Sequence, residues 1–306
     1  MKILIIQQRY GIGDMVIFLP YIHAISKKFN VPVSLLCKES SKASEILGED
    51  KHVSEIITLD KKKDGLTGFF KLSREIKKRN FDKVFIFNSS LRYNLIARFS
   101  GIKSINQYPL FRSKDNIVHS AKIFTENIIG EVVSSEPNIK LNLIKNDYDK
   151  NFKHICLGIS ASGPTKRWGI DNYIKLCREL IKDKKCKFYI LAGKEDIELI
   201  NKLKNSNVEN NFKSVEKLSI NEILPIIKRC DCYIGSDTGF AHLAVGLNVK
   251  ALTLFMDSPV MAYGKYSSRM ITIEPEGEKD STKHDTLGKD RISFNEVLSE
   301  AIKLIN

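Results

Sequence analysis

The sequence predicts an α/β protein with two doubly wound parallel sheets, each forming its own domain. Short apolar runs, of the kind found in strands buried on both faces, alternate with amphipathic helices along most of the chain. This alternation is typical of parallel sheets that carry helices on both faces. It begins again after about residue 151, so we expect a second sheet of the same type.

The first domain is expected to begin with a buried strand, a glycine turn and a long helix. Residues 2–6 are apolar, the turn follows at residues 11–14, and residues 15–29 place apolar side chains at helical spacing. The helix expected at 69–79 is both basic and amphipathic. The other elements predicted in this part of the chain are strands at 31–37, 53–59 and 83–87 and a helix at 40–47.

The regular alternation is lost between residues 132 and 151, where the sequence contains Pro137 and several Asn residues. Such a stretch is typical of a crossing between domains, and we predict domains at 1–148 and 149–306. We expect the last helix, 293–306, either to close the second sheet or to pack back on the first domain. The other elements predicted in the second domain are strands at 154–159, 187–192, 232–235 and 250–255 and helices at 170–180, 195–203, 220–230 and 238–245.

The composition restricts the class of protein and the chemistry of its partners. Hydrophobic residues make up 42% of the chain and charged residues 28%, which excludes an intrinsically disordered protein. The 49 Lys and Arg residues exceed the 36 Asp and Glu residues by 13, which favours an anionic partner such as a phosphorylated substrate, an acidic lipid or a nucleic acid. A generally lysine-rich surface is the alternative explanation. Because no nucleic-acid-binding module is recognised, we do not expect a nucleic acid as partner.

The cysteines and the hydropathy of the chain indicate its compartment. The six cysteines form no CxxC pair, so we expect free thiols in a reducing cytosol and neither a zinc site nor a redox dithiol. No stretch reaches the roughly 18 apolar residues that a membrane-spanning helix needs, and the apolar start is too short for a signal-peptide core. We therefore predict a cytoplasmic protein, which is still compatible with contact to a membrane surface.

Ligands of doubly wound sheets bind at the carboxyl ends of the strands, so we expect a binding cleft between the two domains. The first candidate segment there is the turn at residues 11–14, whose glycines allow a ligand to approach the backbone. Asp14 is suited to accept a proton from a hydroxyl group, or it only caps the helix that follows. A dinucleotide-binding turn is a competing interpretation, supported by Glu39 after the second strand but opposed by Val16, which stands where a third glycine is needed.

The second candidate segment, residues 160–168, follows the first strand of the second domain. It combines small and hydroxyl residues and a Gly-Pro turn with Lys166 and Arg167. Backbone N–H groups, hydroxyl groups and a cation can together bind a diphosphate, so we predict a phosphate-binding loop. The alternative is a polar turn with solvated basic residues and Trp168 as a packing anchor.

The third candidate segment, residues 235–244, contains a strand end, a tight turn and a helix start. The first N–H groups of that helix, near Thr238 and Gly239, have no partner within it and favour an anion. Asp237 either contributes to this site or only caps the helix. His242 lies one turn into the helix, and we favour a role in the site over simple packing.

Together the three segments resemble glycosyltransferase family 9, the ADP-heptose:lipopolysaccharide heptosyltransferase family. The most specific match is the run at residues 236–244, which is similar to the family signature (S/N)DTGxxHxA. Gly13 and Asp14 with the apolar helix after them resemble the family's (I/V)GD(V/M) motif, and Lys166 with Trp168 resembles its KxW element. The three matches occur in the family's order and extend over nearly the whole chain.

The resemblance implies a GT-B fold that binds the acceptor mainly in the N-terminal domain and the nucleotide-sugar in the C-terminal one. It implies an inverting transfer without metal or cofactor, with Asp14 as the general base and with Gly13 and Arg9 on the acceptor side. Arg9 would take the place of a basic residue that the family often carries there. The donor-binding residues that the resemblance implies are Ser160, Ser162, Thr165, Lys166, Asp237, Thr238, Gly239 and His242.

We therefore predict a glycosyltransferase that moves a sugar, with heptose the leading candidate, from an ADP-sugar to a lipopolysaccharide core or related glycan acceptor. The acceptor would be an anionic glycolipid, and the enzyme would be cytoplasmic with peripheral contact to the inner membrane. The lysine and arginine clusters at 61–63 and 74–79 either meet acidic groups of that acceptor or form a solvated face. The alternatives are an NAD-dependent oxidoreductase that uses the Gly11–Gly13 turn, and a non-catalytic sugar-nucleotide-binding protein of the same fold.

Overall fold

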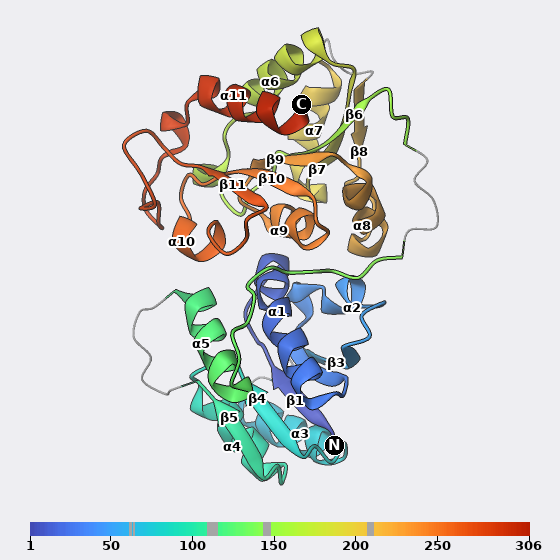
Figure 1. The fold of residues 1–306 in the computed structure, drawn as a ribbon, viewed down its shortest axis with the longest axis vertical. Coiled ribbons are helices and arrows are strands. Elements are labelled where there is room, and N and C mark those ends of the chain that lie inside the picture. Colours follow the sequence, from blue (N-terminus) through green and yellow to red (C-terminus); the bar gives the residue numbers. More distant parts are fainter. Residues whose placement is uncertain (61–62, 64, 109–115, 143–147, 207–210) are drawn as a thin grey trace. The chain divides into compact units, whose positions relative to one another are not determined.

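The computed structural model describes residues 1–60, 63, 65–108, 116–142, 148–206 and 211–306. These residues form two compact units, Met1–Ser135 and Glu136–Asn306. Each unit contains one parallel sheet with helices on its two faces, which confirms the predicted fold class (Figure 1). The division lies inside the stretch that we expected to connect the domains, but earlier than the predicted boundary between residues 148 and 149.

The sheet of the first unit has the strand order β3-β2-β1-β4-β5, with all neighbouring strands parallel. Successive side chains of β1 point to opposite faces, so Leu4 and Ile6 join a core with α3 and α4, while α1 packs with α5. The strands are β1 (Ile3–Ile6), β2 (Val33–Lys38), β3 (Val53–Leu59), β4 (Lys83–Ile86) and β5 (Ser104–Gln107). The helices are α1 (Ile12–Phe29), α2 (Ala43–Ile46), α3 (Gly65–Lys77), α4 (Leu91–Phe99) and α5 (Ile117–Ile129).

The sheet of the second unit has the strand order β11-β10-β9-β6-β7-β8, again with parallel neighbours. Its strands are β6 (Lys153–Gly158), β7 (Cys186–Leu191), β8 (Phe212–Ser214), β9 (Cys232–Ser236), β10 (Lys250–Leu254) and β11 (Met270–Ile273). Its helices are α6 (Ile170–Asp183), α7 (Ile197–Lys204), α8 (Ile220–Arg229), α9 (Gly239–Gly246), α10 (Val260–Tyr263) and α11 (Phe294–Ile305).

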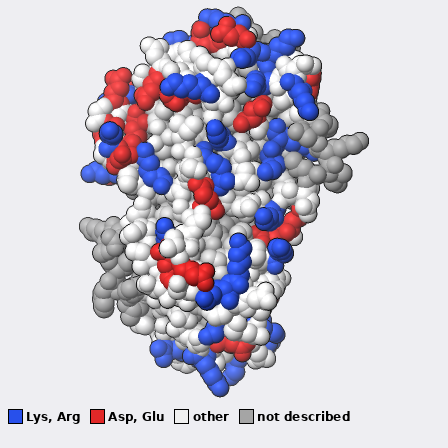
Figure 2. All heavy atoms as spheres, in the orientation of Figure 1, with Lys and Arg blue, Asp and Glu red and all other residues white. Residues whose placement is uncertain are grey.

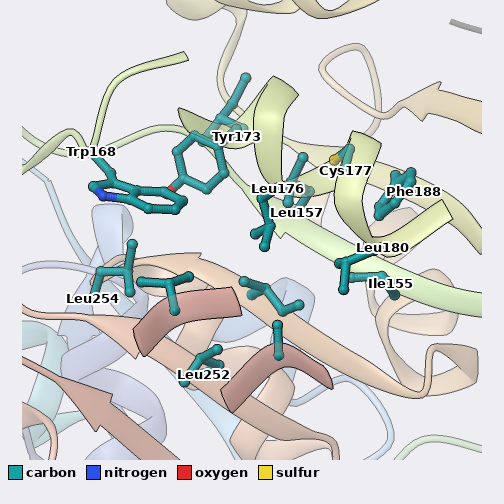
Figure 3. Close-up of a cluster of buried hydrophobic side chains, with 14 of the residues drawn as sticks. Ile155, Leu157, Trp168, Tyr173, Leu176, Cys177, Leu180, Phe188, Leu252 and Leu254 are labelled. Atoms are coloured by element: carbon teal, nitrogen blue, oxygen red, sulfur yellow. The ribbon is translucent and has the colours of Figure 1, made fainter. Parts of the chain in front are cut away.

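The main core of the second unit lies between its sheet and the helices α6 and α11. Figure 3 shows part of this core, with the ring of Tyr173 facing Trp168 edge-on at a centroid distance of 5.2 Å. The apolar face of α11, with Val297, Ala301 and Ile305, is buried in the same core. The last helix therefore closes the sheet of its own unit, as the first of our two alternatives expected.

The elements that the sequence did not predict are mostly short or lie at sheet edges. The strands β5, β8 and β11 have three or four residues each and end their sheets, where a strand needs no continuous apolar run. The helices α4, α5 and α10 were also not predicted. The helix expected at 40–47 is divided, because a short 3₁₀ turn at Glu39–Ser41 ends at Lys42, which has a positive φ of 55°.

A buried polar cluster joins α1 to the turn before β3. His23 Nε2 lies 2.7 Å from Asp50 Oδ2, and Asp50 Oδ1 accepts the His52 N–H at 2.9 Å. Burial would raise the pKa of Asp50, but the hydrogen bonds and charges of the two histidines lower it below its ordinary value. Burial and the nearby charges of His23, Lys27 and Lys51 outweigh the effect of Asp50 and lower the pKa of His52.

These shifts make the stability of the chain pH-dependent. We expect the free energy of unfolding to fall as the pH drops below about 6.5, because unfolded His52 then binds a proton that the folded protein resists. Asp50 adds a second loss below about pH 3.8, where its unfolded carboxylate is protonated first. Urea unfolding measures the free energy of unfolding across this pH range. Near pH 6, this free energy should fall less steeply with decreasing pH in His52→Gln than in the unmodified chain. The exposed His119, replaced by Gln, serves as control, and equal slopes in the two variants would contradict this account.

Candidate functional site

In each unit, the chain reverses its direction of winding next to the first strand. The neighbours β1 and β4 enclose this switch point in the first unit, and β6 and β9 enclose it in the second. Loops that leave the carboxyl ends of such strands form the ligand-binding edge of a doubly wound sheet. The three candidate segments all lie there, because they follow β1, β6 and β9.

The first segment presents a carboxylate at the start of α1. Gly11 precedes the helix with a φ of 92°, a conformation that a side chain would strain. Asp14 is the third residue of the helix, so it is not the N-cap residue, contrary to our alternative. Its carboxylate Oδ1 instead accepts a hydrogen bond from Arg9 Nε at 2.7 Å and is mostly buried. Gly13 lies beside it in the same turn, where helical N–H groups have no partner within the helix.

Gln7, a fully buried residue that the sequence analysis did not single out, supports this pair. Its side-chain amide donates to the backbone oxygen of Asp14 at 3.4 Å, and its Oε1 accepts the N–H of Arg9 at 3.1 Å. Gln7 thus fixes the backbone of both partners. A polar residue directly after an apolar strand, in a turn that carries candidate site residues, is the signal that could have revealed it.

The second segment forms a loop that Asp257 ties down. Thr165 Oγ1 donates to Asp257 Oδ2 at 2.7 Å, and the N–H of Leu287 donates to Asp257 Oδ1 at 3.2 Å. Burial would raise the pKa of Asp257, but these hydrogen bonds and the positive charge of Lys166 lower it. The sequence analysis missed Asp257, which lies nearly a hundred residues from the loop that it holds. Only its position after a buried strand pointed to it.

Three consecutive residues of this loop, Lys166, Arg167 and Trp168, differ in their contacts. The guanidinium of Arg167 pairs with the buried Asp196 at 3.0 Å, and Trp168 packs on Tyr173 and Phe294. These two residues anchor the loop, as our alternative expected for Trp168. Lys166 forms no ion pair within the described ranges and is half-buried. Lys166 therefore remains as the cation that the loop can offer to an anion.

The third segment starts α9 with a capped first turn. Thr238 is the N-cap residue, and its Oγ1 accepts the N–H of Phe240 at 3.3 Å. Asp237 is therefore not the cap, contrary to the alternative for this residue. The N–H groups of Thr238 and Gly239 remain at the positive end of the helix, where they can bind an anion.

A buried chain of polar side chains holds this turn in place. Asp237 Oδ2 accepts the hydroxyl of Ser258 at 2.6 Å, and Asp237 Oδ1 lies 3.4 Å from His242 Nε2. The other ring nitrogen of His242, Nδ1, lies 2.8 Å from the hydroxyl of Tyr266. Burial, reinforced by the charges of Asp237 and Glu136, raises the pKa of Tyr266, which keeps its proton available for His242. Only 3% of the surface of His242 is exposed, so this residue supports the turn from the interior of the unit.

The second and third segments are brought together by a close approach of two strands. Gly158 and Gly235 pair across β6 and β9, and a Cβ atom on Gly235 would lie 2.4 Å from the Gly158 oxygen. The hydroxyl of Tyr173 lies 3.0 Å from that same oxygen and 3.1 Å from Ser236 Oγ. The hydroxyl of Tyr233 donates to the Ser236 oxygen at 2.7 Å. These contacts fix the ends of both strands and hence the starts of both loops.

The predicted site residues thus fall into two groups, one in each unit. Arg9, Gly13 and Asp14 lie in the first unit, where Arg9 and Asp14 are in contact. The predicted donor-binding residues all lie at the carboxyl edge of the second sheet, and Asp257 and Ser258 after β10 join them there. The second group comprises Ser160, Ser162, Thr165, Lys166, Asp237, Thr238, Gly239 and His242.

Three further findings concern metals, thiols and membranes. Within the described ranges, no three His, Cys, Asp or Glu side chains are grouped so that they could hold a metal ion. All six cysteines are free and buried, and burial raises the pKa of Cys186 to about 11, which makes it unreactive. In the same part of the chain, none of the helices has the length and apolar character needed to cross a bilayer.

Comparison with known proteins identifies the family. The model of glycosyltransferase family 9 (heptosyltransferase) matches residues 131–289, more than half of the chain. The chain belongs to glycosyltransferase family 9. The matched region contains the two candidate segments of the second unit, whereas Asp14 lies outside it. Membership of this family argues against the alternative of an NAD-dependent oxidoreductase.

Individual relatives agree with this assignment. The chain is 26% identical over 181 residues to lipopolysaccharide heptosyltransferase 1 of Campylobacter coli, an alignment that covers 56% of this chain and 49% of the relative. The match therefore spans about half the length of that curated relative.

Solved structures of this family share the fold over the whole chain. A family 9 glycosyltransferase of Veillonella parvula has a TM-score of 0.85 at 17% identity and covers 99% of this chain and 97% of its own. The ADP-heptose lps heptosyltransferase II of E. coli has a TM-score of 0.77 at 17% identity, with coverage of 100% and 98%. E. coli heptosyltransferase WaaC, solved with ADP, has a TM-score of 0.75 at 12% identity, with coverage of 99% and 100%. The predicted GT-B fold is thus confirmed.

The hydrogen bonds of Asp257 predict that this residue stabilises the loop at residues 160–168. We expect Asp257→Asn to lower the free energy of unfolding by about 1–3 kcal/mol, because it weakens charged hydrogen bonds to partly buried partners. Chemical denaturation measures the loss. Asp183→Asn at the exposed end of α6 is the control and should have little effect. Equal stability of the two variants would show that Asp257 does not hold the loop.

Proposed function

We propose that this chain is an inverting glycosyltransferase that moves heptose from an ADP-linked donor to a lipopolysaccharide core or related glycan acceptor, without a metal or cofactor. The proposal is supported by membership of family 9 and by the relatives that are named as heptosyltransferases. One observation carries it at the level of chemistry. Lys166 and the N-terminal N–H groups of α9 lie on neighbouring loops at one edge of the second sheet, as a diphosphate leaving group requires.

The donor chemistry follows from the charge that develops on the leaving group. When the bond between the sugar and the diphosphate breaks, the diphosphate oxygen keeps the electron pair and gains negative charge. Lys166 and the N–H groups of Thr238 and Gly239 can stabilise this charge because they are already oriented. Thr165 donates its hydroxyl to Asp257, so we assign it to positioning and assign direct contact to Ser160 and Ser162.

The acceptor chemistry requires a base in the first unit. Asp14 would remove the proton of the acceptor hydroxyl while the oxygen attacks the anomeric carbon from the face opposite the diphosphate. One carbon–oxygen bond forms as the other breaks, and this single displacement inverts the configuration. The carboxylate is largely buried and held by the turn, which preserves its orientation for the transfer.

Arg9 couples acceptor binding to the base. In the structure its guanidinium contacts the Asp14 carboxylate. An acidic group on the acceptor would attract the same guanidinium. Arg9 would then release the Asp14 carboxylate, which would be able to accept a proton. This role explains why a basic residue and the base occur in one short turn.

We assign the reaction to a reducing compartment such as the cytoplasm, which suits the six buried free thiols.

Asp14→Asn tests the base. We expect the rate of transfer to fall by about 100-fold or more, because the amide has nearly the same shape but cannot accept the proton. Binding of ADP, measured by calorimetry, should be unchanged. Asp171→Asn changes an acid in the first turn of another helix, α6, and should retain full activity. Normal transfer by Asp14→Asn would remove Asp14 from the mechanism, and absence of transfer by the unmodified chain would favour a non-catalytic binding protein.

Lys166→Ala tests the donor site. We expect the dissociation constant for ADP to rise by about 10- to 100-fold, because a charged hydrogen-bond donor to the diphosphate is lost. Lys250→Ala, at the exposed amino end of β10 on the opposite edge of the sheet, should bind ADP normally. Thermal-shift measurements of the unmodified chain should show stabilisation by ADP and little by UDP, GDP or NAD. A preference for another nucleotide would refute the ADP-linked donor.

A further inference from the structure

Two neighbouring helices of the first unit expose large apolar side chains that the proposed reaction does not use. Leu66 on α3 is 82% exposed and Phe99 on α4 is 61% exposed. Further exposed apolar and basic residues lie on the same two helices or, in the case of Lys78, directly after the end of α3. We call this surface the α3–α4 face and define it by Leu66, Phe70, Arg74, Lys77, Lys78, Leu91, Leu95, Arg98 and Phe99.

The exposed residues lie along one side of each helix. On α3, Leu66, Phe70, Arg74 and Lys77 follow one another at intervals of three or four residues, the spacing of one helical face. On α4, Leu91, Leu95 and Phe99 do the same. The opposite sides of both helices are buried against the sheet, so the apolar residues on the outer side are not part of the core.

Contacts between the two helices make this face a preformed surface. The ring of Phe69 on α3 packs edge-on against Phe70 at 5.2 Å and against Phe99 of α4 at 5.4 Å. Ser100, at the end of α4, donates its hydroxyl to the oxygen of Ser73 on α3 at 3.0 Å. The two helices therefore run side by side, and their apolar residues form one surface.

The charge of the face is positive. The sequence of α4 contains no acidic residue, and α3 contains only Glu75, which pairs with Lys63 at 3.1 Å and with Arg79 at 3.5 Å. Figure 2 shows Lys and Arg atoms, with some Asp and Glu atoms among them, at the end of the first unit where Figure 1 places α3 and α4. Of the basic clusters that the sequence analysis identified, Lys63 and Arg79 are thus engaged internally, and residues 61 and 62 lie outside the described residues. Arg74, Lys77 and Lys78 are exposed.

We propose that the α3–α4 face docks on an anionic lipid bilayer. Apolar side chains on an amphipathic surface enter the boundary between headgroups and acyl chains, while basic side chains remain at the anionic headgroups. The face carries both kinds of residue and has no unpaired acid on its two helices, which matches the charge of such a bilayer. Each basic residue near the surface strengthens binding by about fivefold.

The direction of the helices links this surface to the candidate acceptor segment. Both α3 and α4 begin after the carboxyl ends of their strands, at the edge of the sheet where α1 and Asp14 also begin. Leu66 and Leu91, in the first turns, therefore lie at the same carboxyl end of the sheet as Asp14, although α1 packs on the other face. A lipid-linked acceptor would be presented at that edge, a statement that rests on the proposed function, whereas the docking itself does not.

Cosedimentation of the full chain with vesicles tests the docking without donor or acceptor. We expect binding to vesicles of phosphatidylglycerol mixed with phosphatidylcholine and little binding to phosphatidylcholine alone. Arg74→Glu, Lys77→Glu and Lys78→Glu combined should weaken binding by about 100-fold or more. Leu66→Ser with Phe70→Ser should weaken it at least tenfold and should keep the fold, because both side chains are exposed.

The control variants change the same residue types on α7 of the second unit. Ile197→Ser combined with Lys202→Glu and Lys204→Glu alters one exposed apolar and two exposed basic residues and should leave vesicle binding unchanged. Absence of binding to the anionic vesicles, or equal loss in the α7 variant, would overturn the proposal. Light scattering gives a further decisive outcome. If Leu66→Ser with Phe70→Ser converts a dimer to a monomer and leaves vesicle binding unchanged, a second copy of the chain covers this face and the proposal is wrong.

Discussion

The architecture of the second unit depends on the close approach of β6 and β9 at Gly158 and Gly235. A Cβ atom on Gly235 would lie 2.4 Å from the Gly158 oxygen, and a Cβ atom on Gly158 would overlap the side chain of Tyr233, so neither position can carry a side chain. The hydroxyl groups of Tyr173 and Tyr233 fill the space beside them and bind the strand ends. Two loops that carry hydroxyl groups, a lysine and helical N–H groups therefore start within one narrow region.

Two carboxylates, Asp257 and Asp237, hold these loops by contacts within the protein. A carboxylate near a diphosphate would repel it unless its charge were compensated. Asp257 is compensated by the Thr165 hydroxyl, a backbone N–H group and the charge of Lys166, and Asp237 by Ser258 and His242. The acids thus fix the geometry of the loops, and in the proposed reaction Lys166 and the amides of α9 would attract the diphosphate.

The same edge of the sheet in the first unit carries a different set of side chains. A single turn after β1 places Asp14 and Arg9 in contact, and the buried Gln7 supports both. The helices that begin at the same edge expose the α3–α4 face. Attraction of acidic groups by Arg9 and of an anionic surface by Arg74 and its neighbours would favour an acidic, lipid-linked acceptor over a free neutral sugar.

The sequence by itself determined the fold class, most of the buried strands, the family and the three segments that line the sheet edges, because these features depend on local periodicity and short motifs. The tertiary structure alone decided which side chains meet. Asp257 and Tyr266 act on residues far away in the chain, and no local pattern reports such contacts. The sequence also did not predict short edge strands such as β5 and β8, because their stability comes from pairing with a neighbouring strand. Likewise, only packing showed that Phe70 and Phe99 lie on an exposed surface, because an apolar helical residue is equally suited to a core.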